Sequence, residues 1–235
     1  MIVSISQPRY LPWLGYFHRL AVSDVFVYLD HVQYTPRDWE NRNKVKGPQG
    51  GTWLTVPVKA EYLARIPDVR VDNEQDWGKR HWKSLDNFYG RAPYFQEYAA
   101  DYRELLCERH WETLTDLNLA MTKRLASHLG LPERQMLRSS QMTLSRSGSD
   151  LILEICRATS ADVYLSGLQG RNYLKEGDFT DAGVRVVYQD YRHPVYPQLH
   201  GPFVPFMAAL DLLFNCGPRS VEILSEDQDP ISATP

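Results

Sequence analysis

The amino-acid sequence predicts an α/β protein built on a mostly parallel β-sheet, with a helical region inserted into it. Three observations lead to this prediction. The first thirty residues or so alternate strand, loop, helix and strand patterns. A long helical pattern then occupies about residues 77–129, and strand and helix patterns alternate again from about residue 136. Such alternation is typical of sheets whose parallel strands are joined by helices.

The N-terminal segment contains the clearest unit of this kind. Ile2–Ile5 is a short apolar run, a helix is expected over Phe17–Ser23, and Val25–Leu29 is a second apolar run. A strand, a helix and a strand in so short a span form a βαβ unit, in which the strands are parallel and the crossover is right-handed. The loop after the first strand then lies at the carboxyl edge of the sheet, where open α/β sheets bind ligands.

The middle of the chain changes character twice. Residues 30–51 are polar and lack a periodic apolar pattern, and strands are expected at Trp53–Val58 and Ile66–Val71. The pattern over residues 77–129 is helical and is divided by Pro93, because proline interrupts a helix. Within it, one apolar stripe at helical spacing consists of Leu114, Leu117, Met121 and Leu125.

The α/β pattern returns in the last part of the chain. One sheet interrupted by helices is simpler than two separate sheets, so we expect a single α/β domain over residues 1–225. The helical insertion is placed at about residues 77–129, and a disordered tail is expected at residues 226–235. The remaining predicted strands are Met136–Ser140, Val163–Gly167 and Val184–Tyr188, and the remaining predicted helices are Ser149–Thr159 and Met207–Asn215.

Composition and charge exclude several classes of protein. The chain of 235 residues carries a formal net charge of −3, which gives no reason to expect DNA binding. Its three cysteines, Cys107, Cys156 and Cys216, are far apart and fit neither a zinc motif nor a disulfide framework. We therefore expect reduced thiols and a cytoplasmic location. No run of about 18 apolar residues is present, so no membrane span is expected.

Aromatic residues are unusually placed. There are 6 Trp and 14 Tyr, and many stand beside Pro, Gly, His, Asn or Arg rather than in periodic apolar runs. Aromatic side chains in polar loops often line ligand pockets, because they provide rigid contact area at a small cost in entropy. The alternative is that they pack the loops onto the core.

The loop of residues 7–18 is the first candidate ligand-binding segment. Its two prolines restrict the backbone, Gly15 permits close backbone approach, and His18 stands near the expected start of the helix. A helix start offers free N–H groups and a positive dipole end, which suit a phosphate or carboxylate. His18 would add a hydrogen bond or a charge to that anion, and the alternative is that it only caps the helix. The side chains expected to contact a substrate here are Gln7, Tyr10, Trp13 and Tyr16.

The second candidate segment is the polar stretch of residues 33–47. The guanidinium of Arg42 suits bidentate contact with phosphate or carboxylate, and the amides of Asn41 and Asn43 suit sugar hydroxyls or base edges. The alternative is a solvated loop. The expected substrate contacts are Gln33, Tyr34, Asn41, Arg42, Asn43 and Lys46.

The third candidate segment, residues 166–174, directly follows a predicted strand. Two glycines together with Ser166 and Arg171 suit a phosphate or carboxylate cradle. The segment is not a Walker loop, because the Gly-Lys-Ser/Thr ending is absent. Its expected substrate contacts are Ser166, Arg171 and Asn172.

The fourth candidate segment, residues 190–203, follows the last predicted strand. His193 and His200 are candidates for general acid–base catalysis. They have no fixed helical register and no nearby thiol, so no metal site is expected. Tyr196 and Gln198 are expected to contact substrate. Cys216 is a candidate nucleophile paired with one of the two histidines, and the alternative is a buried thiol at a helix end.

These stretches, in this order, resemble the WbqC-like family of bacterial proteins. Together the matching segments span residue 2 to about residue 217. The resemblance implies a protein of surface-polysaccharide or natural-product gene clusters, with a proposed role in adding glycine to an amino sugar. The segments are Q-P-R-Y-L-P-W-L-G-Y-F-H, L-D-H-V-Q-Y, W-E-N-R-N-K-V-K-G, W-L-T-V-P-V, A-P-Y-F, Y-L-S-G, H-P-V-Y-P-Q-L-H-G-P-F and D-L-L-F-N-C-G.

A more distant similarity links the chain to nucleotidylyltransferase-type Rossmann proteins, including the ligase that joins pantoate to β-alanine. It rests on the strand, proline-containing loop, G-x-x-H and helix, and on Ser166 followed by Gly170–Leu174. In those proteins an H-x-G-H motif binds ATP phosphates, whereas here Gly15 stands in place of the first histidine and leaves His18 alone. The similarity implies a Rossmann-like sheet and makes ATP a candidate cofactor.

Together these features predict an enzyme that transfers an amino acid group, glycine-like, to an amine on a nucleotide-linked sugar or similar small metabolite. In this hypothesis it is an acyl or aminoacyl transferase or an amide-forming ligase. His18 and Arg171 hold phosphate or an activated carboxyl group, and His193 or His200 accepts the amine proton. The donor is left open among an adenylate made from ATP, a carrier-protein thioester and an aminoacyl-tRNA. The alternatives are a nucleotidylyltransferase and a non-catalytic binding protein of a polysaccharide assembly pathway.

Overall fold

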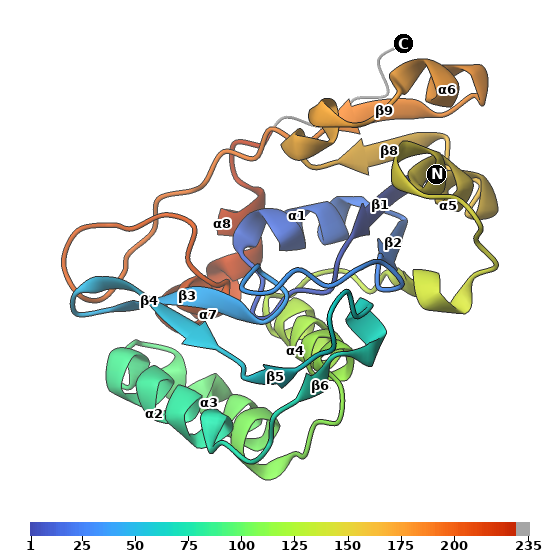
Figure 1. Cartoon of the computed structure of the whole chain (residues 1–235). Helices are drawn as coiled ribbons and strands as arrows, with labels where there is room; N and C mark the ends of the chain where they lie inside the picture. The colour runs from blue at the N-terminus through green and yellow to red at the C-terminus, as the bar shows by residue number, and fades with distance from the viewer. Residues whose placement is uncertain (229–235) are drawn as a thin grey trace.

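A five-stranded parallel sheet forms the centre of the computed structural model, which describes residues 1–228. The spatial order of the strands is β7-β2-β1-β8-β9, so the chain leaves β1 on one side and later returns to pair with its other side (Figure 1). This order is that of a Rossmann-like sheet, and it confirms the predicted fold class. The strands are β1 (Ile2–Ser6), β2 (Val25–Tyr28), β7 (Gln135–Arg138), β8 (Val163–Ser166) and β9 (Arg185–Tyr188).

The predicted βαβ unit is present at the N-terminus. Strand β1 pairs in parallel with β2, with Val3 opposite Val25, and helix α1 (Leu14–Val22) connects them. The helix begins earlier than the expected Phe17. Gly15 and His18 therefore lie within the helix and not in the loop before it.

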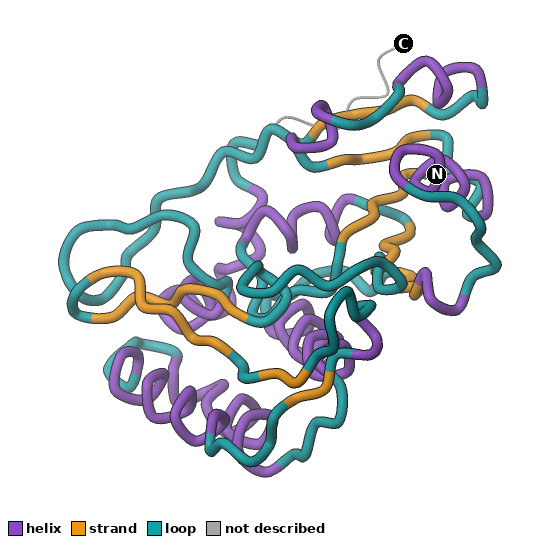
Figure 2. Tube along the Cα trace, viewed as in Figure 1, coloured by secondary structure: helices purple, strands orange, loops and turns teal. Residues whose placement is uncertain are grey.

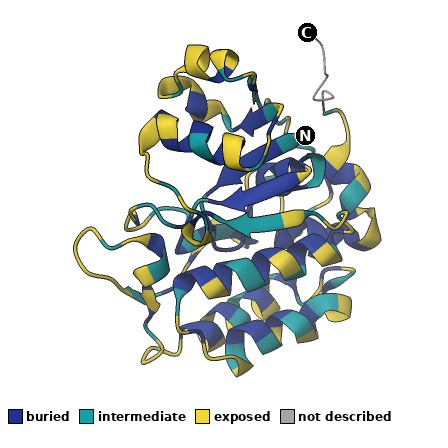
Figure 3. Ribbon diagram, turned by 90° about the vertical axis from the view of Figure 1, so that its right-hand side faces the viewer, coloured by how far each residue is buried: buried dark blue, intermediate teal, exposed yellow. Residues whose placement is uncertain are grey.

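The two faces of the sheet belong to two hydrophobic clusters, because successive side chains of a strand point to opposite sides. Val3 and Ile5 of β1 pack with helix α5 (Gly148–Ala158) in one cluster. Phe26 of β2 packs with α1 and with helix α4 (Leu114–His128) in the other. Figure 3 shows the inner strands of the sheet as buried and an edge strand as partly exposed, whereas the helices carry exposed residues on their outward sides.

An antiparallel hairpin lies outside the central sheet. It consists of β3 (Arg42–Gly47) and β4 (Gly50–Thr55), with Lys44 opposite Trp53. The prediction of a non-periodic polar stretch over residues 30–51 was wrong for this strand. The inward side chains of β3 include the polar Asn43, which is buried and bonded to backbone carbonyls, so the strand has no apolar alternation to reveal it.

Two further predicted strands are shorter than expected. The predicted run Trp53–Val58 is divided at Pro57, which lacks an N–H to donate, and the two-residue strand β5 (Val58–Lys59) follows it. In place of the predicted strand Ile66–Val71, a 3-10 turn over Ile66–Asp68 precedes the two-residue strand β6 (Arg70–Val71).

The helical pattern of the middle of the chain is confirmed. Helices α2 (Trp77–Tyr89) and α3 (Phe95–Arg103) are separated near Pro93, and a π-helical turn at Glu104–Glu108 ends α3. Within the described residues, no helix is long and apolar enough to cross a membrane. The predicted stripe of α4 is fully buried and consists of Leu114, Leu117, Met121 and Leu125.

A long connection leads from β9 to the last helices. It runs as a wide loop over residues 189–209 toward the β3–β4 hairpin before the chain enters α7 (Leu210–Cys216) (Figure 2). The backbone N–H of Ala208 donates to the carbonyl of Lys44 at 2.8 Å, which ties the returning chain to the hairpin. Helix α6 (Glu176–Asp181) precedes β9, and α8 (Ser220–Ser225) is the last helix of the described residues.

The predicted disordered tail, residues 226–235, lies outside the described residues from position 229 onward. Within the described part of that range, the side-chain amide of Gln228 donates to the carbonyl of Arg192 at 2.8 Å. The division into one domain over residues 1–225 with an insertion at about 77–129 stays a prediction.

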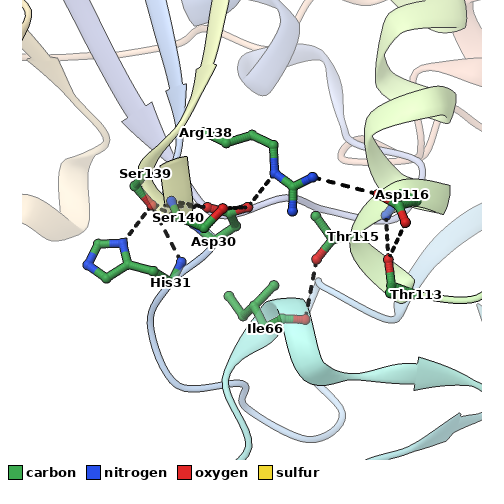
Figure 4. A network of polar contacts seen from close by, with 9 residues as sticks. All are labelled: Asp30, His31, Ile66, Thr113, Thr115, Asp116, Arg138, Ser139 and Ser140. Carbon is green, nitrogen blue, oxygen red and sulfur yellow. Dashed lines mark hydrogen bonds and ion pairs between the residues drawn. The ribbon is translucent and has the colours of Figure 1, made fainter. Parts of the chain in front are cut away.

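A buried carboxylate joins the carboxyl ends of β2 and β7 (Figure 4). Asp30 accepts hydrogen bonds from Arg138 Nε at 2.7 Å and from Ser140 N at 2.8 Å. It also accepts from Ser140 Oγ at 2.9 Å and from Ser139 Oγ at 3.2 Å. The Arg138 guanidinium extends to Asp116 of α4, with Nη1 3.7 Å from the carboxylate. Sequence patterns did not single out this cluster, because Asp30 lies more than a hundred residues before Arg138, Ser139 and Ser140.

We expect Asp30→Asn to lower the free energy of unfolding by about 3 kcal/mol, because it leaves a partly buried guanidinium without its counter-charge. Asp116→Asn is the matched control. Asp116 lies at the exposed end of the same cluster, so we expect a loss below about 1 kcal/mol. Urea unfolding followed by circular dichroism measures both values. Equal losses in the two variants would contradict the role given to Asp30.

Candidate functional site

A cavity of about 550 Å³ opens at the carboxyl ends of β1 and β8. These two strands are adjacent in the sheet, yet the connections that follow them leave in opposite directions. Open α/β sheets bind ligands at such a switch point. The cavity is large enough for a metabolite of nucleotide size. Its lining includes Ser6 and Ser166 at the ends of β1 and β8, Gln7 and Gly167 directly after them, and Gln189 after β9.

The backbone of the first loop, which reaches this cavity, is held by hydrogen bonds to the β3–β4 hairpin and to the segment just before it. The backbone N–H of Tyr10 donates to the carbonyl of Trp39 at 3.0 Å. The side-chain amide of Asn43 donates to the carbonyl of Leu11 at 2.6 Å. Leu11 adopts a positive φ of 45°, a conformation that costs energy for a branched residue and persists only where neighbours hold it. The second candidate segment thus supports the first loop.

The cationic part of the cavity consists of Arg9 and Arg19. Arg9 belongs to the first loop, and Arg19 comes from the second turn of α1. Arg19 is only 8% exposed, and its Nη2 donates to Ser6 Oγ at 3.3 Å. Its Nε has no hydrogen-bond partner among the described residues. Burial, together with the nearby charge of Arg9, lowers the pKa of Arg19. None of the described lining residues is an aspartate or a glutamate.

The aromatic part of the cavity comes from the first loop and from the connection of residues 189–209. The indole of Trp13 contacts the rings of Tyr191 and Phe206, each at 5.5 Å between centroids. All three side chains line the cavity. A Cβ on Gly15 would lie 2.3 Å from the indole of Trp13, so the glycine is needed because this ring lies directly over it. The predicted close approach at Gly15 thus involves Trp13.

His18 lies beneath this cavity and does not belong to its described lining. Its side chain is 6% exposed, and Gln189 Nε2, from the cavity lining, donates to its Nδ1 at 3.0 Å. The same Gln189 amide donates to the carbonyl of Gly15 at 2.9 Å. Burial and the nearby Arg19 lower the pKa of His18 to about 4, so the imidazole is neutral near pH 7. A neutral, buried ring suits positioning of Gln189 better than binding of an anion.

His193 stands beside the aromatic part of the cavity. Its ring lies 5.2 Å from that of Phe206 and 6.5 Å from that of Trp13, measured between centroids. Its Nδ1 lies 2.9 Å from the carbonyl oxygen of Pro194. Because that contact needs a donor on the ring, Nδ1 carries the proton and Nε2 presents a lone pair. Nε2 is buried and has no partner among the described residues. Burial lowers the pKa of His193, which favours this neutral form.

His200 and the nearby polar residues form a separate buried cluster under the connection of residues 189–209. His200 Nε2 contacts the carbonyl oxygen of Phe88 at 2.7 Å. Lys46 Nζ donates to the carbonyl of Pro202 at 2.6 Å. Asp211 of α7 accepts from Tyr196 Oη at 2.9 Å and from Gln198 Nε2 at 2.6 Å. These contacts hold the connection in place, and none of the predicted residues His200, Lys46, Tyr196 and Gln198 belongs to the described cavity lining.

Seven other predicted residues lie outside the described cavity lining. Tyr10 Oη contacts His81 Nδ1 at 2.8 Å, and Asn41 Nδ2 donates to the carbonyl of Val56 at 3.0 Å. The guanidinium of Arg42 lies 4.3 Å from the ring centre of Trp53. Outside the described lining lie Tyr10, Asn41, Arg42, Asn43, the buried Tyr16 and Tyr34, and the exposed Gln33.

The third candidate segment contributes most of its residues to the cavity. Residues 166–170 and Tyr173 belong to the lining. Arg171 stacks on Tyr188 at 4.3 Å, and both Arg171 and Asn172 are exposed outside that lining. Of the residues predicted to contact substrate, the cavity therefore brings together Gln7, Trp13 and Ser166.

Sequence reasoning missed several cavity residues. Arg19 follows His18 directly in the sequence, but nothing in the spacing of the helix expected over Phe17–Ser23 marks an arginine that faces a cavity. Gln189 and Phe206 were missed because the order of strands decides which loops reach β1.

Among residues 1–228, no group of three or more His, Cys, Asp or Glu side chains could hold a metal ion. The three cysteines are free, and burial raises the pKa of Cys216 to about 11, which makes it a poor nucleophile near neutral pH.

The fold and this cavity define a Rossmann-like α/β protein with a cavity at the switch point of its sheet. Within that class, the chain belongs to the WbqC-like protein family, whose profile matches residues 7–223. It is 36% identical over 225 residues to an uncharacterized protein of Mycobacterium tuberculosis, a match that covers 94% of this chain and 96% of that protein. No solved structure matches the chain.

The lowered pKa of His18 predicts an acid-sensitive fold. The unfolded chain takes up a proton on this ring near pH 6.5, whereas the folded chain does so only near pH 4. Stability is therefore complete above pH 6.5 and falls as the pH drops toward 4, by up to about 1.4 kcal/mol per pH unit for this histidine.

Urea unfolding at several pH values measures this slope in the wild type, in His18→Gln and in the control His110→Gln. His110 is exposed. We expect a shallower slope only in His18→Gln, and an unchanged slope in that variant would contradict the assignment.

Proposed function

We propose that this protein is a biosynthetic enzyme that transfers an amino acid group, glycine-like, to an amine on a metabolite bound in the switch-point cavity. A nucleotide-linked amino sugar is the acceptor that we favour. Membership of the WbqC-like family supports a biosynthetic role. The observation that carries the proposal is the state of His193: its ring packs against Trp13 and Phe206 of the cavity lining, and its unprotonated Nε2 has no partner among the described residues.

The chemistry required of His193 is that of a general base. The acceptor amine attacks the carbonyl carbon of the donor, so a C–N bond forms and the bond from that carbon to the leaving group breaks. The amine loses one proton, which Nε2 of His193 accepts. A base acts best when it is neutral at the working pH, and burial keeps His193 neutral by lowering its pKa.

The remaining roles follow from the same geometry. Trp13, Tyr191 and Phe206 offer rigid apolar surface to a ring of the substrate. His18 acts on the site through Gln189, which reaches the cavity, and is therefore a positioning residue. The acyl donor is one of three classes: an adenylate formed from ATP, a thioester on a carrier protein, or an aminoacyl-tRNA.

The reaction is tested by incubating the purified protein with a nucleotide-linked amino sugar and glycine in the form of each donor class. Mass spectrometry of the sugar should show the mass gain of one glycyl group with one of the donors. Absence of a mass gain with all three donors would falsify amide formation.

Substitution of the proposed base gives a sharper expectation. His193→Gln should lower kcat by about 10²–10⁴-fold, because the amine loses its proton acceptor while the binding surface stays in place. KM should change little. Initial rates of the same mass assay give both constants, and the exposed His110→Gln is the control. His200→Gln separates the two histidines that the sequence singled out, and a loss of kcat in that variant alone would transfer the role to His200.

A nucleotidylyltransferase is the second candidate, and the strand order of the sheet favours it, because the same order supports nucleotide binding at the same edge. Release of pyrophosphate from a nucleoside triphosphate, without transfer of an amino acid, would establish this candidate in place of the first. Binding of the same metabolites without either reaction would indicate a non-catalytic binding protein.

A further inference from the structure

We infer that Arg19 and Arg9 form a subsite for the phosphoryl groups of a phosphorylated metabolite, with Arg19 as its fixed member. The inference deepens the proposed function, because it names the chemical class of the ligand in the same cavity. It rests on the proposed function only in treating that cavity as the active site.

The first argument is the unpaired charge of Arg19. More than nine-tenths of this side chain is buried, and it lines the cavity. Its side chain donates one long hydrogen bond, from Nη2 to Ser6 Oγ at 3.3 Å, and its Nε has no partner among the described residues. Within residues 1–228, no ion pair joins it to a carboxylate. A buried guanidinium without a counter-charge is costly, and such charges are normally paired. A bound anion supplies the missing partner.

The second argument is the position of Arg9 relative to Arg19. Both side chains line the same cavity, and burial together with the charge of Arg9 lowers the pKa of Arg19. Two like charges in one cavity repel each other unless an anion lies between or beside them. Arg9 also acts on the buried Glu40, but burial raises the pKa of that carboxyl to about 7, so near pH 7 it offers only partial compensation.

The third argument is the space and the donors around the Arg19 head group. A Cβ on Gly167 would lie 3.6 Å from Arg19 Nη1, so the missing side chain leaves that side of the guanidinium open. Ser6 and Ser166 add hydroxyl groups to the same lining. Guanidinium forks match phosphate oxygens bidentately, and two of them balance the charge of a diphosphate better than that of a single carboxylate.

The test uses inorganic diphosphate as the probe and compares the wild type with Arg19→Met and with Arg157→Met. Methionine keeps the length of the side chain and removes the charge. Arg157 is an exposed residue of α5 and provides the matched loss of one positive charge. Calorimetric titration gives the Kd for diphosphate, for inorganic phosphate and for acetate at equal ionic strength, and thermal unfolding gives the Tm of each free protein.

We expect diphosphate to bind the wild type and Arg157→Met with equal Kd. We expect its Kd for Arg19→Met to be at least about tenfold higher. We also expect the ligand-free Arg19→Met protein to have a higher Tm than the wild type, because it no longer buries an unpaired charge. A purely structural arginine would give a lower Tm in this variant. Equal binding of diphosphate to Arg19→Met and wild type, or equal binding of acetate and diphosphate to the wild type, would overturn the inference.

The outcome is independent of the proposed reaction. Arg19-dependent binding of diphosphate without transfer of glycine would keep the phosphoryl subsite and reject amide formation. Transfer of glycine by a protein that does not bind diphosphate through Arg19 would do the reverse.

Discussion

The position of β1 in the sheet is the constraint on which the rest of the structure depends. Because β1 pairs with β2 on one side and with β8 on the other, the connections that leave the two neighbouring carboxyl ends must diverge. The cavity is the space left between them. The side chains of Ser4 and Ser6 on β1 are small and polar, and both contact α1, through Ser23 and Arg19 respectively. Helix α1 can therefore approach β1 closely, and Arg19 is placed at the carboxyl end of β1.

The site is completed by chain that belongs to no sheet. The connection of residues 189–209 brings Gln189, Tyr191 and Phe206 into the cavity lining, and His193 packs against Phe206 outside that lining. Loops of this length are mobile unless their polar groups find partners. Here Lys46, Asp211 and Ala208 bind the connection to the hairpin and to α7. The β3–β4 hairpin, which also holds the first loop, thus supports both sides of the cavity from outside.

The candidate site combines features that oppose stability. Arg19 is buried without a carboxylate, and His18 is buried in the neutral form. Natural sites often retain such groups at a cost to the fold, because their interactions are completed by the ligand. The Asp30 cluster shows the contrast within the same sheet edge, since there the buried carboxylate has four hydrogen-bond donors of this chain around it. The Asp30 carboxylate is fully bonded by this chain, whereas the Arg19 guanidinium keeps an unpaired Nε.

The sequence by itself determined the local elements and the place of the first ligand loop. The strand runs at Ile2 and Val25, the helical stripe of α4 and the interruption at Pro93 are short-range patterns, and local patterns suffice to predict them. The sequence also identified Gln7, Trp13 and Ser166 as candidate cavity residues. Gln7 and Trp13 lie in the loop that follows β1, and Ser166 lies at the end of β8. Only the tertiary structure decided that β8 lies beside β1, that the polar strand β3 exists, and that Arg19 rather than Arg171 faces the cavity. Strand order and the direction of a single side chain depend on contacts between residues far apart in the chain, and no local periodicity records them.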